Sequence, residues 1–114
     1  MSCRSSYTFP VTIPNGTALS NVVSFHEYAY GILHMPAAWT AASIGFQVCS
    51  TIDGTFLPLY DEGGTLVELT VTVDQAHPLP AEVLAARYVK IWSETGGAGV
   101  NQGAARSLIV DMKS

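Results

Sequence analysis

Hydrophobic and polar residues alternate with a period of two along much of this chain, which is typical of β-strands with one face in a core. The stretch 44–60 shows the pattern best. Large apolar side chains occupy every second position of 44–48, an Asp-Gly pair at 53–54 marks a tight turn, and a second apolar run follows over 56–60. This spacing is expected of a hairpin. We therefore predict two antiparallel strands joined near Asp53.

Similar runs elsewhere predict about eight short strands in all. They are expected over residues 7–13, 19–25, 31–35, 44–48, 56–60, 67–73, 87–93 and 105–112. Turn signals separate them every dozen residues or so, and many short strands at this spacing are typical of an all-β sandwich or barrel. The length of 114 residues fits one domain of this kind.

Pro10 interrupts the first predicted strand. Because proline has no N–H to donate to a sheet, a strand that contains it is confined to an edge. We therefore predict that residues 1–14 form an N-terminal arm or edge strand and that residues 15–114 form the β-sandwich domain. The arm is a candidate for the segment that reaches a neighbouring molecule.

The composition points to a partner other than nucleic acid or a membrane. Charged residues make up only 12% of the chain, below the usual quarter, so the surface is either unusually uncharged or covered. Residues 5–86 contain no Lys or Arg, which leaves no basic patch for a row of phosphates. No apolar run is long enough for a signal peptide or a membrane span, so synthesis in a cytoplasm is expected.

Candidate chemistry is weak, and we predict a non-enzymatic protein without a cofactor or metal. His26-Glu27 lacks the second histidine of a zinc helix, because Tyr30 stands at that position. Asp53, Asp61 and Glu62 could supply oxygens to calcium, but the set is incomplete. A small hydrolase would need a cleft containing a carboxyl group with a shifted pKa.

One predicted strand has large side chains on both faces. If Val89 and Ile91 point into the core, then Tyr88, Lys90 and Trp92 lie on the opposite side. In a two-layer sandwich that side faces solvent or a neighbour. We therefore predict that the N-terminal arm or another subunit covers it.

The glycine-rich segment 96–103 is either a hairpin tip or a loop that becomes ordered on a partner. Its amides and the exposed aromatic residues are the candidate partner contacts. The full set is Tyr7, Phe9, Tyr28, Tyr30, Tyr88, Trp92, Asn101 and Gln102.

Two sets of residues resemble known families. The stretches 46–50, 53–56 and 86–91 resemble the jelly rolls of discoidin-like domains and carbohydrate-binding modules. The stretches 35–42 and 100–102 resemble small proteins encoded among the head genes of tailed bacteriophages, of the capsid decoration or cement type. The likeness extends from Ile32 to the end.

The phage resemblance implies a jelly-roll-like virion protein on the capsid surface. Its expected partners are the major capsid protein, whose shell it would stabilise, and itself, as a homotrimer. The alternative that the first resemblance implies is a carbohydrate-binding module, or a head or tail fibre part for host adhesion. That alternative needs a sugar stacked on Trp39 or Trp92.

Overall fold

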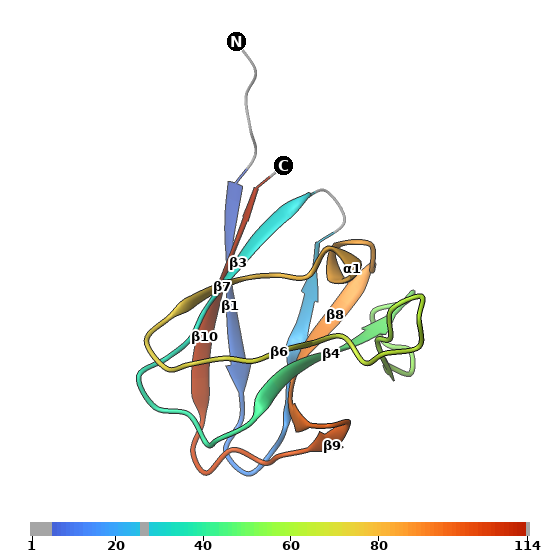
Figure 1. The fold of residues 1–114 in the computed structure, drawn as a ribbon. Helices are drawn as coiled ribbons and strands as arrows, with labels where there is room; N and C mark the ends of the chain where they lie inside the picture. Colours follow the sequence, from blue (N-terminus) through green and yellow to red (C-terminus); the bar gives the residue numbers. More distant parts are fainter. Residues whose placement is uncertain (1–5, 26–27, 114) are drawn as a thin grey trace.

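Two antiparallel sheets pack face to face in the computed structural model, which describes residues 6–25 and 28–113 (Figure 1). The strands are β1 (Ser6–Ile13), β2 (Leu19–Ser24), β3 (Tyr30–His34), β4 (Ser43–Cys49), β5 (Leu57–Pro58), β6 (Glu68–Leu69), β7 (Ala76–Pro78), β8 (Tyr88–Thr95), β9 (Ala98–Gly99) and β10 (Arg106–Lys113). A single helical turn, α1 (Ala81–Leu84), lies between β7 and β8. The predicted antiparallel β-sandwich is confirmed.

The strand order brings together segments that are far apart in the sequence. Sheet A has the order β1-β10-β3-β7. Sheet B has the order β2-β8-β4-β5, with β6 paired to β4 and β9 paired to β8. The first and last strands are therefore neighbours in sheet A, and the described ends of the chain lie at the same end of the sandwich (Figure 1).

The core follows from the alternation in the strands. In β10 every second residue from Leu108 to Met112 is buried, as a period of two requires, and Ile44 and Phe46 of β4 and Val89 and Ile91 of β8 are buried at the same spacing. Phe25 and Phe46 are the largest fully buried side chains. Other core residues are Val11, Ile13, Leu33, Ile44, Val89, Ile91, Leu108 and Val110.

Residues 6–13 of the predicted arm form the edge strand β1, which pairs with β10 along its whole length. Two features block the open edge of β1. Pro10 has no N–H, and the N–H of Thr12 donates to Oδ1 of Asn21 at 2.9 Å. Both features reduce pairing with a foreign strand. Cys3, at the start of the chain, lies outside the described residues, as do His26 and Glu27.

The predicted strand over 67–73 is shorter than expected, because only Glu68–Leu69 pairs. The free edge of β4 is shared between two segments. Val48 pairs with β5, and Ile44 pairs with Leu69 of β6. The alternation still turns Val67 into the core. An alternating segment thus forms a strand only where a neighbouring strand has an edge that is not already paired.

No helix within residues 6–25 and 28–113 has the length and apolar character needed to cross a membrane.

Candidate interaction surfaces

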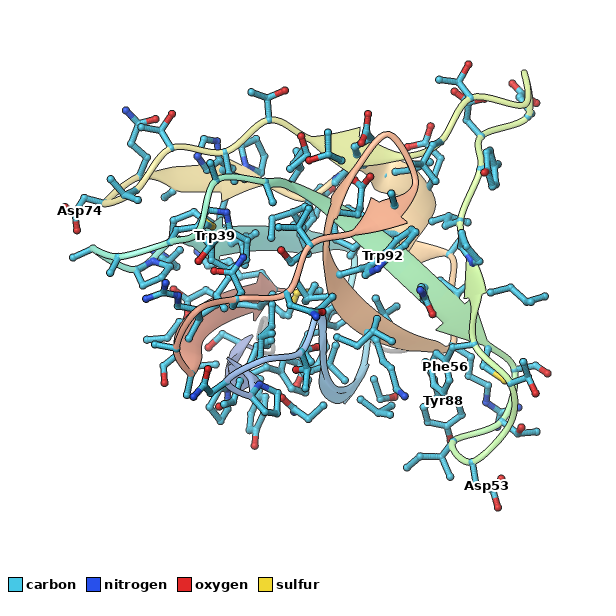
Figure 2. The ribbon with its side chains drawn as sticks, turned by 90° about the horizontal axis from the view of Figure 1, so that it is seen from below. Trp39, Asp53, Phe56, Asp74, Tyr88 and Trp92 are labelled. Atoms are coloured by element: carbon cyan, nitrogen blue, oxygen red, sulfur yellow. The ribbon has the colours of Figure 1, made fainter. Side chains whose placement is uncertain are left out.

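Trp92 lies on the outer face of sheet B, as its alternation predicts, but its side chain is only 6% exposed. Gly45 stands directly opposite on β4, and without a side chain it leaves room for the indole, whose ring lies 3.0 Å from where a Cβ would be. A Cβ on Gly99 of β9 would likewise lie 3.5 Å from the indole nitrogen. The chain's own hairpin therefore covers Trp92 (Figure 2). The prediction that this ring faces solvent or a neighbour is wrong.

The rest of that outer face is also contacted from within the chain. Phe56, in the loop before β5, lies under the Lys90 ammonium, with 4.6 Å from Nζ to the ring centroid. The Arg87 guanidinium lies 5.9 Å from the ring centroid of Tyr88. Neither the N-terminal arm nor another subunit is needed to explain the aromatic side of β8.

Gln102 is buried, so the prediction that it is available to a partner is also wrong. Its Oε1 accepts from the Thr40 N–H at 2.8 Å and from Nε of Arg106 at 3.1 Å. Its Nε2 donates to the Thr40 carbonyl at 3.1 Å and to the Ser93 hydroxyl at 2.8 Å. The amide therefore ties the 36–42 loop to β8 and to the start of β10. Asn101, next to it, is exposed.

The Gln102→Ala variant should lose about 2 kcal/mol of unfolding free energy, because the buried groups around the amide lose their partners. Asn101→Ala removes the same type of side chain from an exposed neighbouring position and serves as the control, with a loss of under about 0.5 kcal/mol expected. Chemical denaturation of both variants measures the difference. Equal losses would contradict the structural role of Gln102.

Four aromatic residues pack together, two from the first half of β1, one just after β2 and one just before β3. Phe9 is at the centre, with ring centroids 4.6 Å from Tyr7, 5.6 Å from Phe25 and 6.1 Å from Tyr28, all edge to face. Tyr7 is 52% exposed, and Tyr30, at the start of β3, is 66% exposed. Among the candidate contacts, Tyr7, Tyr30 and Asn101 are thus exposed, whereas Phe9, Tyr28 and Tyr88 are half-buried. Their role as partner contacts stays a prediction.

Sequence reasoning missed a second surface, the side of sheet A that faces away from the core. Its centre consists of two rows that cross the four strands in register. The first row contains Pro10, Ile109, His34 and Ala76, and the second contains Thr8, Asp111, Ile32 and Pro78. We call these eight residues the sheet A outer face. The signal was present, since Ile32 and Ile109 occupy outward positions of their strands, where polar residues are usual.

The sheet A outer face has only two ionisable groups, and they pair with each other. Oδ2 of Asp111 lies 2.8 Å from Nε2 of His34, and Oδ1 accepts from the Thr8 hydroxyl at 2.7 Å. The bond from Thr8, followed by the bond and charge of His34, holds the pKa of Asp111 below its usual value. Two isoleucines lie next to this pair, Ile109 with 44% and Ile32 with 38% of its surface exposed.

The acidic residues considered for calcium are separate. The Oδ1 atom of Asp61 accepts from the N–H groups of Gly63 and Thr65, both at 2.9 Å, and so closes its own turn. Asp53 lies at the tip of another loop (Figure 2). Within the described part of the chain, no three His, Cys, Asp or Glu side chains gather as a metal site.

Glu94 has an unusual environment for a carboxyl group. It is fully buried, and burial, followed by contact with Glu68, raises its pKa to about 7. A shifted carboxyl is what a small hydrolase would require. The side chain has no exposed surface, however, so no substrate can reach its oxygens in this arrangement.

Searches with this chain against protein-family models, curated proteins and solved structures found no match. The exposed surfaces of the fold are therefore the remaining basis for assigning a function.

Proposed function

We propose that this chain is a non-enzymatic virion protein of a tailed bacteriophage, a capsid decoration or cement protein. It binds the outer surface of the shell formed by the major capsid protein and stabilises that shell. It acts as a homotrimer at local threefold positions. The resemblance of 35–42 and 100–102 to head-gene proteins supports this proposal, and so does the low content of charged residues.

The observation that carries the proposal is the sheet A outer face. An open face of an antiparallel sheet is normally polar and often charged, because it meets water. Here Ile32 and Ile109 lie beside Pro10 and Pro78, and the one acid is already paired with His34. Such a face loses little solvation when it is covered.

The mechanism is adhesion through burial of apolar area. Each Å² of apolar surface removed from water contributes on the order of 25 cal/mol, and a standard contact buries about 1,600 Å² in total. Repetition over a lattice adds many such contacts, so that a modest affinity per copy strengthens the whole shell.

Sugar binding has less support. Trp39 is half-buried, with its Nε1 donating to the Ala42 carbonyl at 3.1 Å, and Trp92 is covered by β9. Trp92 therefore offers no open face for stacking a sugar, and the Trp39 ring is packed against the core. We therefore favour the capsid over a glycan as the partner.

Changing one central isoleucine should separate docking from folding. Ile109→Lys puts an unpaired ammonium into the proposed contact, and we expect binding to weaken at least about tenfold, which corresponds to 1.4 kcal/mol. Val73→Lys is the matched control, because Val73 is exposed to a similar extent (39%) but lies outside sheet A. The measurement is co-sedimentation with shells assembled from the major capsid protein alone.

Two results would contradict the proposal. One is wild-type protein that does not sediment with the shells, and the other is Ile109→Lys protein that binds as well as Val73→Lys protein. Native mass measurement of the purified protein tests the trimer separately, and a monomer at micromolar concentration would remove that part.

A further inference from the structure

Glu94 is a buried acid with one oxygen satisfied and one not. Its Oε1 accepts from the N–H of Gly97 at 2.8 Å, across the turn that joins β8 to β9. Its Oε2 is buried and has no hydrogen-bond partner. A buried carboxylate oxygen without a donor is strongly disfavoured. The environment therefore favours a form of Glu94 in which Oε2 carries a proton.

A second carboxyl group, that of Glu68, lies close to Glu94 beside Gly45. Gly45 is on β4, between β6 and β8, and it stands opposite Glu68 on one side and Trp92 on the other. A Cβ on Gly45 would be 2.8 Å from Cγ of Glu94 and 2.9 Å from its Oε2, so the Glu94 carboxyl leans over this glycine. Glu68 lies on the same face, across the same glycine. The missing side chain thus lets the two acids meet.

Two carboxyl groups in contact favour one proton between them, since like charges at short range repel. A protonated Oε2 of Glu94 can donate to the carboxylate of Glu68, which satisfies the orphan oxygen. The raised pKa of Glu94 agrees with this arrangement, because burial is its main cause and the interaction with the Glu68 side chain is the next.

A metal ion is a poorer explanation than a proton. No cluster of three His, Cys, Asp or Glu side chains occurs in residues 6–25 and 28–113. Glu68 is the charged group that acts on Glu94, while β4 presents Ser43 and Gly45, and the turn presents Gly97. Two carboxyls without further ligands fall short of what calcium or magnesium requires.

We propose that Glu68 and Glu94 share one proton and form a pH-sensitive latch that holds the β8–β9 turn over Trp92. In the protonated state, Glu94 stays buried and its Oε1 keeps the bond to Gly97. Loss of the proton leaves two carboxylates side by side, and Glu94 then moves toward water. The Gly97 bond breaks, and β9 loosens from the indole of Trp92.

The sign of the pH effect follows from the raised pKa. In the folded chain Glu94 titrates at about 7, above its usual value of 4.5, so the folded state binds the extra proton between these values. Stability from this group is present in full below the usual value and is lost as pH rises through about 7. An ordinary paired carboxylate behaves in the opposite way.

Carbon-13 NMR of the glutamate carboxyls in the wild-type chain tests the latch directly. We expect one carboxyl, assigned to Glu94, to titrate near neutral pH. Glu68→Gln should lower that pKa clearly, because it removes the neighbouring charge. Glu62→Gln removes an exposed acid from the turn at 61–64 and is the matched control, with no effect expected.

Trp92 supplies a second readout. The chain has two tryptophans, so Trp39→Phe leaves Trp92 as the only one. Its fluorescence should shift to the red as pH rises from about 6 to about 8, through the titration of Glu94. Adding Glu94→Gln should remove that shift. If Trp39→Phe does not fold, the indole N–H signal of Trp92 in wild-type NMR spectra gives the same information.

Three outcomes would overturn the latch. The first is a Glu94 carboxyl that titrates at its usual value. The second is a Glu68→Gln variant in which the pKa of Glu94 is unchanged. The third is a titration that millimolar calcium or magnesium displaces to lower pH, because the carboxyls would then bind a cation. All of these measurements use the isolated chain and do not depend on capsid binding.

Discussion

Replacing Phe46 with alanine is expected to lower the free energy of unfolding by about 3 to 5 kcal/mol. Phe46 is fully buried on the inward face of β4, which pairs with β8 along its whole length. Truncation removes the ring's transfer free energy and leaves a cavity between two sheets that cannot close over it. Because domains of this size are stable by about 5 to 15 kcal/mol, this single change removes a large part of the total. Urea denaturation measures it.

Phe56→Ala is the matched control for this effect. The same ring is removed, but from the outer side of sheet B, where it is half-buried beneath Lys90. A loss of about 1 kcal/mol is expected there, from the cation–π contact and partial burial. Similar losses for the two variants would mean that β4 does not separate a core face from an outer face.

Replacing Gly45 with valine is expected to cost about 3 kcal/mol. By strand propensity alone the change should stabilise the fold, because valine is more favourable than glycine in a strand by up to about 1 kcal/mol. At this position even the first added carbon would lie within 3.0 Å of Glu94 and of the Trp92 ring. Both neighbours are buried, so neither moves freely. A loss of stability in Gly45→Val, in place of the gain expected from strand propensity, would therefore indicate that Trp92 packs over Gly45 of β4.

Alanine at two glycines provides the control for Gly45→Val. Gly45→Ala should destabilise the fold in the same direction by a smaller amount. At Gly103, which is exposed, an added carbon meets only the Thr40 hydroxyl at an ordinary 3.6 Å. Gly103→Ala should be neutral or stabilising by up to about 1 kcal/mol, through the unfolded state. A stable Gly45→Val protein would show that Trp92 does not lie over Gly45.

The strands and their inward faces could be predicted because a period of two is a local property. Val89, Ile91 and Phe46 alternate with their neighbours in the sequence itself, so the buried side of β4 and β8 was readable without knowing what pairs with them. Pairing is not local. The alternation over 67–73 resembles a strand, but only part of it can pair with β4, because β5 pairs with the other part of the same edge.

The failed predictions share a physical cause. The outward side of Trp92 was predicted correctly, but the segment that covers it, β9, is two residues long and has no hydrophobic pattern. Gln102 and Asn101 are adjacent amides, and only the folded chain shows which of them is buried. Which side chain a short loop covers, and which buried polar group finds a hydrogen-bond partner, depends on the folded structure and not on the local sequence. The resemblance to phage head proteins remains a prediction.

The partnership of β1 with β10 imposes a delay on the nascent chain. Thr8 and Asp111, which hydrogen-bond across these strands, are 103 positions apart. At 5 to 20 residues per second, the ribosome needs roughly 5 to 20 s to make β10 after it has made β1. Throughout that interval β1 is an unpaired strand in a crowded cell. The proline at its middle removes an N–H from the edge that β10 does not use, and it therefore protects this strand during synthesis as well as in the finished sheet.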